Sequence, residues 1–379
     1  MEKKKICIDV NPVVPLFVRG FLSGIGRTTF DLLNALNQLS DLPFEISLYS
    51  QNMKGLGGRN LNLSFQNKHL YFPHRARYNK LLAASPVREW FTGYDLMHIT
   101  HNFEYIRHPE KTIVTLHDAL FMKMQEQQFE HEKMRKLVPP LMRRCKAIIT
   151  CSENSKRDII ETMGIHPNKI HVIPWGVRHD IFFSMEDKDE NKRLLTERFG
   201  IERAYFFSVS CNMERKNTPR LIDCYIEFSK KNIQHDLCLV WDAPQSVRHQ
   251  VICAGLQNRI HFIGTVDDDS LRLLYAGATA TLFPSLYEGF GLPILESMAC
   301  GTPVICSNTS SLPEVGGDAA IYVDSTDNQS IIQAMTDVEN MSNGSLLDLS
   351  QRGVERAKAY SWSKCAQETA NVYMKCLNQ

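Results

Sequence analysis

The stretch ATLFPSLYEGFGLPILESMACGTPVICS (residues 280–307) reads as a strand, a glycine turn, a helix and a second strand. Residues 280–285 and 302–307 are short apolar runs of the kind that form buried strands. Pro293 stands where the helix would begin, a position at which its missing N–H costs nothing. A strand–helix–strand unit is the building block of a parallel sheet, so this stretch predicts an α/β fold.

The same alternation runs along all 379 residues, a length sufficient for two domains. Helical patterns lie between the strands, as at 24–39 and at 153–164, where Gly164 ends the pattern. A polar stretch near 178–190 reads as a linker. The expected strands are 3–10, 44–50, 95–100, 112–118, 147–152, 170–175, 204–210, 236–242, 259–264, 280–285, 302–307 and 319–324. The sequence therefore predicts two parallel, doubly wound sheets.

Composition favours a soluble globular protein, with 43% hydrophobic and 22% charged residues. No apolar run reaches the roughly 18 residues that a membrane span needs. Residues 1–17 are basic and then apolar, but Asp9 and Asn11 interrupt the apolar part, so they read as a first strand rather than a signal peptide. The eleven cysteines include no C-x-x-C pair. This pattern predicts reduced thiols in a cytoplasm, without a disulfide framework or a zinc site.

Charge is distributed unevenly along the chain. Residues 1–180 contain 25 Lys and Arg against 17 Asp and Glu, whereas residues 181–379 contain 18 against 25. Two readings are open: a difference between two ordinary domains, or a first domain that meets an anionic partner. Two segments interleave basic residues with apolar ones, 71–91 (with Arg75, Arg77, Lys80 and Arg88) and 133–146 (with Arg143 and Arg144). They predict either peripheral contact with the inner face of an anionic membrane or two ordinary amphipathic helices.

The turn between the strand and the helix has the features of a phosphate site. Gly289 and Gly291 permit a tight bend and a close approach of a ligand to the backbone. The amides of Phe290, Gly291 and Leu292 would then stand at the start of a helix, where phosphate is attracted. The turn is therefore a candidate binding site for a phosphorylated ligand.

Two carboxylates flank this turn, Glu288 on the turn itself and Glu296 in the first turn of the expected helix. Neither suits direct contact with phosphate, but both can accept hydrogen bonds from hydroxyl groups on either side of it. A phosphate between two polyols describes a nucleotide sugar. For Glu296 the alternative is that it only complements the helix dipole.

The pattern E-G-F-G-L-P-x-L-E-x-M-A-x-G-x-P-V, from Glu288 to Val304, resembles the E-x7-E signature of retaining glycosyltransferases of the GT-B fold, family 4. The combination of GIGR (24–27) with SLYEGFGLP (285–293) and SSLPEVGGDAA (310–320) resembles most the mannosyltransferase-like members that build bacterial surface polysaccharides. Other segments that resemble the family, in order along the chain, are 23–33, 115–120, 150–159, 171–177, 215–217, 262–278 and 360–377.

The resemblance implies a GT-B architecture of two Rossmann-like domains that face each other across a cleft. Residues 1–180 would form the N-terminal acceptor-binding domain. Residues 181–360 would form the C-terminal domain that binds the nucleotide sugar. Residues 361–379 would form a C-terminal helix that crosses back to the first domain.

The resemblance also assigns roles to donor-binding residues. Arg215 and Lys216 would neutralise the diphosphate, and that charge grows as the sugar–phosphate bond breaks. Glu296 would bind the ribose hydroxyls and Glu288 those of the donor sugar. Backbone amides of the turn would reach the sugar and phosphates, and the residues that supply this backbone are Gly289, Phe290, Gly291 and Leu292.

In the first domain the resemblance points to two further places. Gly24 and Gly26 would let the backbone close over the diphosphate. His117 would lie beside the transferred sugar, and Asp118 would orient it or act on the acceptor side. Read without the family, a lone histidine at a strand end is more often a structural hydrogen-bonding group.

The expected reaction is retaining transfer of a hexose, with GDP-mannose as the first candidate donor, to a glycan or lipid-linked glycan acceptor in cell-surface polysaccharide assembly. The departing phosphate would act as the base in a front-face attack. No resident cofactor, no metal and no nucleic acid are expected. The Asp-rich run 267–269 precedes a helix, so it reads as a cap, and Arg215 and Lys216 already supply positive charge.

Other functions stay open. A dinucleotide-dependent oxidoreductase is disfavoured, because GIGRTT (24–29) lies about fifteen residues beyond the first strand and has Thr29 in place of the third glycine. A nucleotide-sugar epimerase of GT-B fold and an inactive nucleotide-sugar-binding scaffold are the alternatives. Four residues depart from the family pattern and leave the sugar and acceptor open: Trp175, Cys211, Trp241 and Asp242.

Overall fold

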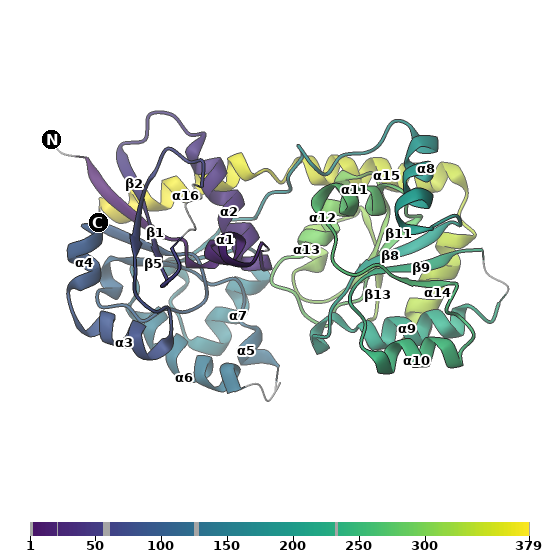
Figure 1. Ribbon diagram of the computed structural model, residues 1–379, viewed down its shortest axis with the longest axis horizontal. Helices are drawn as coiled ribbons and strands as arrows, with labels where there is room; N and C mark the ends of the chain where they lie inside the picture. The colour runs from purple at the N-terminus through teal and green to yellow at the C-terminus, as the bar shows by residue number, and fades with distance from the viewer. Residues whose placement is uncertain (1–2, 21, 56–60, 125–128, 232–233, 379) are drawn as a thin grey trace. The chain divides into compact units, whose positions relative to one another are not determined.

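The computed structural model describes residues 3–20, 22–55, 61–124, 129–231 and 234–378. The chain divides into two compact units. Unit 1 comprises Met1–Gly176 and Trp362–Gln379, and unit 2 comprises Val177–Ser361. The sequence predicted boundaries after residues 180 and 360. The first lies four residues from the observed division after Gly176, and the second lies one residue from the division after Ser361. Each unit contains one sheet between layers of helices (Figure 1).

The sheet of unit 1 has seven parallel strands in the order β3-β2-β1-β4-β5-β6-β7. The strands are β1 (Lys4–Asp9), β2 (Phe44–Gln51), β3 (Gln66–Leu70), β4 (Leu96–Ile99), β5 (Thr112–Thr115), β6 (Ala147–Thr150) and β7 (Ile170–Val172). The helices are α1 (Val14–Arg19), α2 (Gly24–Asn37), α3 (Ala76–Ala84), α4 (Val87–Thr92), α5 (Leu120–Lys123), α6 (Phe129–Arg144), α7 (Glu153–Met163) and α16 (Trp362–Leu377), with 3-10 helices η1 (Asn11–Val13), η2 (Pro109–Lys111) and η3 (Pro167–Lys169).

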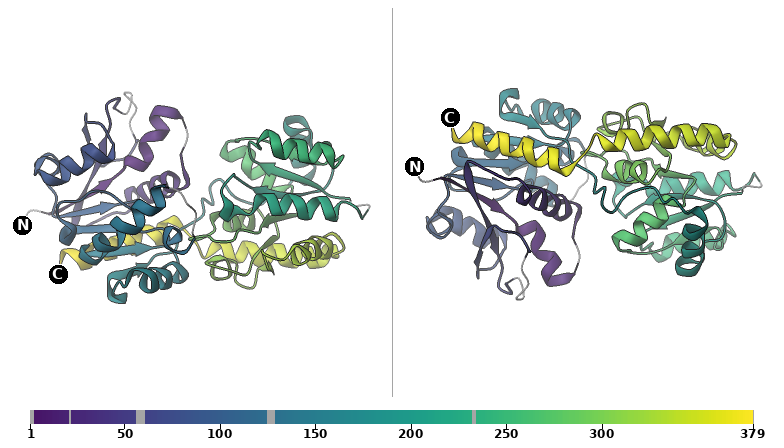
Figure 2. Two further views of the ribbon diagram at one scale, coloured as in Figure 1. Left: turned by 90° about the horizontal axis from the view of Figure 1, so that it is seen from below. Right: turned by 90° about the horizontal axis from the view of Figure 1, so that it is seen from above.

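Unit 1 has an apolar core on each face of its sheet. On one face α2 and α16 pack together, with Leu33, Leu36 and Ala366 buried against the strands (Figure 2). On the other face Val138 and Met142 of α6 pack with α5 and α7. The burial of both faces explains why the strands read as continuous apolar runs.

The sheet of unit 2 has six parallel strands in the order β10-β9-β8-β11-β12-β13. The strands are β8 (Tyr205–Val209), β9 (Asp236–Val240), β10 (Ile260–Phe262), β11 (Ala280–Phe283), β12 (Val304–Ser307) and β13 (Ala320–Val323). The helices are α8 (Lys188–Phe199), α9 (Thr218–Phe228), α10 (Gln245–Cys253), α11 (Asp268–Ala276), α12 (Leu292–Ala299), α13 (Leu312–Gly316), α14 (Asn328–Glu339) and α15 (Asn343–Lys358), with the 3-10 helix η4 (Glu214–Lys216).

Helices begin and end where the sequence signals them. Ser152 accepts a hydrogen bond from the amide of Ser155 at the start of α7, and Gly164 ends that helix in the left-handed region with φ of 64°. Asp267 caps α11 by accepting from the amide of Ser270 at 2.8 Å. The predicted cap in the run 267–269 and the predicted stop at Gly164 are therefore confirmed.

All twelve strands expected from the sequence are present in the described residues, but β3 was missed. Its sequence, QNKHL, is polar, because β3 is an edge strand of half-buried residues. No helix of the described chain is long and apolar enough to cross a membrane. All eleven cysteines are free thiols.

A buried histidine links the sheet of unit 1 to α16. His98 on β4 is 0% exposed, and its ring nitrogens lie 2.6 Å from the hydroxyl of Tyr373 on α16 and 2.8 Å from that of Thr115 on β5. Burial lowers the pKa of His98 to about 3, so the imidazole is neutral at pH 7.

This burial predicts acid sensitivity. Between pH 6.5 and 3 the unfolded chain binds a proton at His98 and the folded chain does not, so stability falls as pH falls, by up to about 1.4 kcal/mol per pH unit. We expect His98→Gln to flatten the dependence of the urea midpoint on pH between 6.5 and 4.5. Equal slopes for the variant and the unmodified protein would contradict the assignment.

Candidate active site

Two cations and one carboxylate meet in unit 2. Arg215 and Lys216 stand on η4, in the loop after β8, and Glu288 stands in the glycine turn after β11. Nη1 of Arg215 donates to Oε2 of Glu288 at 2.7 Å, and Nζ of Lys216 lies 2.8 Å from Oε1 of Glu288. The structure therefore brings together three residues predicted from the sequence, and the cluster carries a net charge of one positive.

The loop that carries the two cations is held from several sides. Asn217 has left-handed backbone, with φ of 56°, and its side-chain Nδ2 donates to the carbonyls of Pro284 and Ser325. The amide of Leu286 donates to the carbonyl of Arg215 at 2.7 Å. These bonds fasten the loop after β8 to the segment after β11, so the cations are positioned before any ligand arrives.

Burial strengthens the electrostatic interactions within this cluster. The side chains are 21% exposed for Arg215, 14% for Lys216 and 10% for Glu288. Burial alone would raise the pKa of Glu288, but Lys216 and Arg215 outweigh it and hold that pKa below its usual value. Lys216 also lies over the ring of Phe283, with Nζ 4.4 Å from the centroid.

The glycine turn is fixed by two serines after β12. The amide of Glu288 donates to Oγ of Ser310 at 3.0 Å. Oγ of Ser311 donates to the carbonyls of Glu288 and Phe290 at 2.9 and 2.8 Å. Sequence patterns assigned no role to either serine, because a serine does not reveal its hydrogen-bond partner.

Gly291 and the residues around it explain the glycine content of the turn. Gly291 has φ of 113°, and a Cβ there would lie 2.8 Å from Cδ2 of Leu312. Both facts favour glycine. Phe290 is 3% exposed, and α12 begins directly after Gly291, with Leu292 first and Pro293 second. The predicted sequence of strand, turn and proline-led helix is therefore present.

The sequence predicted Glu296 in the first turn of the helix. In the structure it is the fifth residue of α12 and therefore stands in the second turn. It is 7% exposed, and Oε2 accepts a hydrogen bond from the hydroxyl of Tyr275 at 3.1 Å. The predicted contact with ribose stays a prediction. Gly289 lies in the same turn, and its predicted backbone role also stays untested.

Gly24 and Gly26 open α2 in unit 1. The amide of Gly26 donates to Oγ of Ser23, which caps the helix. A Cβ on Gly26 would lie 2.5 Å from the carbonyl oxygen of Pro12, so glycine lets α2 pack against η1. A Cβ on Gly24 would meet nothing within 4 Å. Gly26 thus has a packing role, and the predicted role of both residues at a diphosphate stays a prediction.

His117 follows β5 and is 6% exposed. Its Nε2 lies 3.0 Å from the carbonyl of Thr100 and therefore carries a proton. Burial lowers the pKa of His117 to about 4, so Nδ1 is a bare acceptor at pH 7, and it makes no hydrogen bond within the described residues. With Trp175, whose ring centroid lies 5.0 Å away, His117 lines a cavity of about 20 Å³ that has room for one water but not for a sugar. Its predicted place beside the sugar stays a prediction.

Asp118 is half-buried, and Oδ1 accepts a hydrogen bond from the amide of Leu120 at 2.9 Å, which supports the start of α5. Of the departures from the family pattern, Trp241 is buried in the core of unit 2, where its ring lies 6.0 Å from that of Phe262. The Asp242 side chain is 93% exposed. These positions make Trp241 a packing residue, whereas Trp175 lies against His117.

Within the described residues no group of three or more His, Cys, Asp or Glu side chains is placed to hold a metal ion. The positive charge observed at the glycine turn comes from Arg215 and Lys216.

Two protein families match successive parts of the chain. Residues 22–181 match the family described as Glycosyltransferase Family 4, and residues 195–359 match Glycosyl transferases group 1. Glu288 and the two cations lie within the second match.

Known proteins of similar sequence are transferases. The chain is 30% identical to O-antigen chain mannosyltransferase B of Escherichia coli over 284 residues, which are 72% of this chain and 72% of that protein. It is 28% identical to O-antigen chain mannosyltransferase RfbU of Salmonella typhimurium over 228 residues, 60% of this chain and 61% of that protein.

Solved structures share the fold at low identity. Sucrose-phosphate synthase of Thermosynechococcus elongatus has a TM-score of 0.77 at 17% identity, covering 98% of this chain and 99% of that chain. Anabaena Alr3699/HepE in complex with UDP and glucose has a TM-score of 0.74 at 18% identity, covering 98% and 100%. With its two parallel Rossmann-like units and both family matches, the chain belongs to the family 4, group 1 glycosyltransferases and has the GT-B fold.

Proposed function

We propose that this glycosyltransferase transfers mannose from GDP-mannose, with retention of configuration, to a glycan or lipid-linked glycan acceptor in cell-surface polysaccharide assembly. The observation that carries the proposal is the Arg215–Glu288–Lys216 cluster at the glycine turn. Mannose is favoured because two relatives are named O-antigen mannosyltransferases. The nucleotide-sugar class is favoured because one structural neighbour was solved with UDP and glucose.

The cluster suits a diphosphate leaving group. In transfer, the bond from the sugar C1 to the diphosphate oxygen breaks, and the acceptor oxygen bonds to C1 on the same face. The acceptor proton passes to the departing phosphate. Negative charge on that phosphate grows during the step, so a fixed pair of cations stabilises the transition state more than the bound donor.

Glu288 has two consequences for this chemistry. It keeps two neighbouring cations buried at low cost, because each has a carboxylate oxygen within 2.8 Å. It also opposes an incoming diphosphate, since like charges repel. We infer that donor binding draws Arg215 and Lys216 toward the phosphates, which leaves carboxylate oxygens of Glu288 to accept from sugar hydroxyls.

Two alternatives differ from transfer in what they consume and release. An epimerase would convert the donor without an acceptor, and an inactive scaffold would bind it without turnover. The relatives described above are named transferases, which favours transfer.

Membrane contact is a second part of the proposal and rests on exposed apolar side chains of α3 and α4. The exposed fractions are 62% for Leu81, 39% for Val87, 78% for Trp90 and 38% for Phe91. Lys80 and Arg77 of α3 are also exposed. Apolar side chains beside basic ones suit an anionic interface.

One basic residue does not belong to that surface. The expectation that Arg88 faces an anionic partner is wrong, because Arg88 is 3% exposed and its Nη1 donates to the carbonyl of Tyr105 at 2.9 Å. Its guanidinium lies 5.5 Å from the ring centroid of Tyr49. Arg88 therefore holds local structure. Arg143 is exposed, and its Nη2 donates to the carbonyl of Met163 at 2.8 Å.

The reaction itself is tested with GDP-mannose and a mixture of glycan acceptors from the producing cell. We expect GDP release that depends on added acceptor and continues in EDTA, and an early product whose mannose has the α configuration of the donor by NMR. Release without acceptor and with an altered sugar would identify an epimerase. A β-linked product would contradict retention.

The cation cluster is tested by GDP binding. Lys216→Ala should weaken binding about ten- to a hundredfold, because it removes a charge-assisted contact of about 1.5–3 kcal/mol. Glu288→Gln should bind GDP at least as tightly as the unmodified protein, because it removes a repelling charge, while transfer falls. Lys230→Ala, an exposed lysine of the same unit, is the control. A loss of GDP binding in Glu288→Gln equal to that in Lys216→Ala would contradict this division of roles.

Membrane contact is tested by sedimentation with vesicles. The protein should sediment with phosphatidylglycerol vesicles and not with phosphatidylcholine vesicles, and 1 M salt should release it, because screening then shortens the reach of charge to about 3 Å. Trp90→Ser should reduce sedimentation, whereas Leu347→Ser, which removes an exposed apolar side chain of unit 2, should not. Equal sedimentation with both vesicle types would contradict the proposal.

A further inference from the structure

Arg356, in the last turn of α15, holds the carboxyl end of the short helix α13. Its Nε donates to the carbonyl of Val315 at 2.9 Å, and its Nη2 donates to the carbonyl of Glu314. Both carbonyls belong to the last turn of α13, where a helix supplies no amide of its own as a partner. One guanidinium therefore binds two carbonyls at the end of a helix of five residues.

Two neighbouring residues fix the guanidinium in this position. Nη2 of Arg356 also donates to the hydroxyl of Tyr360 at 2.9 Å, and that hydroxyl donates to the carbonyl of Glu314 at 3.3 Å. Gly317 has φ of 57°, and a Cβ there would lie 3.1 Å from Cζ of Arg356. Glycine at this position therefore leaves room for the guanidinium.

The other end of α13 holds the glycine turn of the candidate active site. Ser311, directly before the helix, donates to the carbonyls of Glu288 and Phe290. Leu312, the first residue of α13, packs so closely on Gly291 that a Cβ on this glycine would lie 2.8 Å from it. A helix of five residues is only about 7.5 Å long, so a displacement at its carboxyl end reaches the turn at its other end.

A second contact reaches the same turn without passing through α13. The ring of Tyr360 packs edge-on against the ring of Phe290, with the centroids 5.9 Å apart, and Phe290 is 3% exposed. The guanidinium of Arg356 lies 5.4 Å from the centroid of the Tyr360 ring. Arg356 and Tyr360 therefore support the turn both through α13 and through the side chain of Phe290.

We propose that Arg356 is a positioning residue of the candidate active site. By fixing α13 and Tyr360 it holds the glycine turn in place, and the turn holds Glu288 against the two cations of the cluster. That the cluster acts on a donor diphosphate rests on the proposed function. The support of the turn by Arg356 does not depend on which ligand binds there.

The support of the turn is tested by amide hydrogen exchange, which needs no substrate. Arg356→Lys keeps the charge, but an amine lacks the planar fork that binds two carbonyls and a hydroxyl at once. We expect amides of residues 286–292 and 312–317 to exchange at least about tenfold faster, because charge-assisted hydrogen bonds are lost. Unchanged exchange at 286–292, or an equal increase throughout unit 2, would overturn the proposal.

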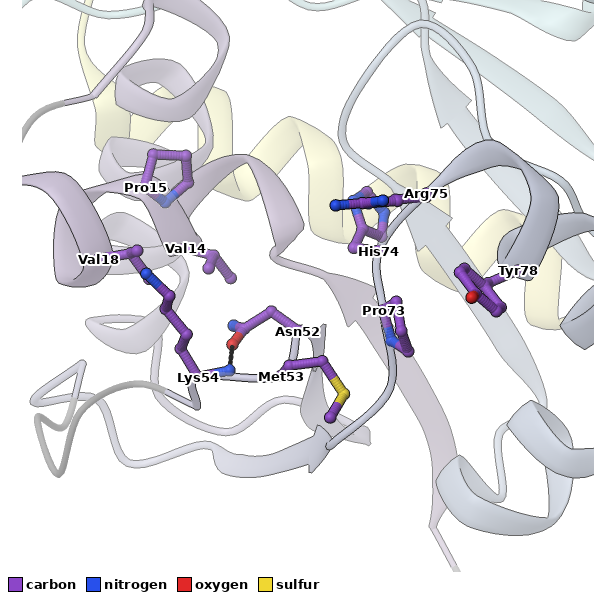
Figure 3. A pocket seen from close by; sticks show the side chains of 10 residues that line it. All are labelled: Val14, Pro15, Val18, Asn52, Met53, Lys54, Pro73, His74, Arg75 and Tyr78. Carbon is purple, nitrogen blue, oxygen red and sulfur yellow. Dashed lines mark hydrogen bonds between the residues drawn. The ribbon is translucent and has the colours of Figure 1, made fainter.

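A matched control and a chemical rescue locate the effect. Arg193→Lys changes an exposed arginine of α8 that pairs with Glu190 and Glu197 of its own helix, and it should leave exchange at the turn unchanged. Added ethylguanidinium should slow exchange of the turn in Arg356→Ala. It should have no effect in Arg75→Ala, whose exposed arginine lines a cavity of unit 1 (Figure 3). An effect of Arg193→Lys equal to that of Arg356→Lys, or no rescue of Arg356→Ala, would overturn the proposal.

Turnover and GDP affinity separate this proposal from the proposed function. In Arg356→Lys, kcat for transfer from GDP-mannose should fall about ten- to a hundredfold, because a small misplacement of fixed charges has an effect of this size. GDP affinity should stay within about threefold, since both cations remain to attract the diphosphate. An unchanged kcat, or a loss of GDP affinity as large as the loss of kcat, would overturn the positioning role. Faster exchange of the turn in Arg356→Lys, together with no transfer by the unmodified protein, would contradict the proposed function and leave the support by Arg356 standing.

Discussion

The ion cluster around Glu288 is the interaction on which the site of unit 2 depends. A carboxylate with 10% exposure needs compensation, and Arg215 and Lys216 provide it from 2.7 and 2.8 Å. Because the cations belong to the loop after β8 and Glu288 to the turn after β11, their attraction joins the two loops. Because the loop that carries the cations is already fixed, only the ends of their side chains need to move to a bound phosphate, and little rearrangement is the condition for electrostatic catalysis.

Sheet topology explains why residues far apart in sequence meet. β8, β11 and β12 are neighbours in one parallel sheet, so the loops that follow them emerge at the same edge. The first supplies Arg215 and Lys216, the second Glu288, and the third Ser310 and Ser311. In unit 1 the adjacent strands β1, β2 and β3 bring three loops to one edge in the same way, and there the loops enclose a cavity.

Sequence patterns predicted the features that depend on local backbone conformation. They missed the features that depend on contacts with residues far away in the sequence. The turn of Gly291 and the stop at Gly164 follow from backbone conformations that glycine adopts most easily, so both were predictable. Arg215 and Lys216 were found through a family resemblance, because a basic pair alone reads as solvated surface. The burial of Arg88 and the serines that brace the turn were missed, since a single arginine or serine does not reveal its partner.

The cations at the glycine turn and the buried histidines of unit 1 differ in charge. Unit 2 keeps buried cations charged by pairing them with Glu288, whereas unit 1 keeps His98 and His117 neutral, with pKa values lowered by burial to about 3 and about 4. A neutral His117 whose Nε2 proton is held by the carbonyl of Thr100 is a poor proton donor to a departing phosphate. If the proposed transfer occurs, His117 would not protonate that phosphate, and Arg215 and Lys216 are the cations placed to meet its charge.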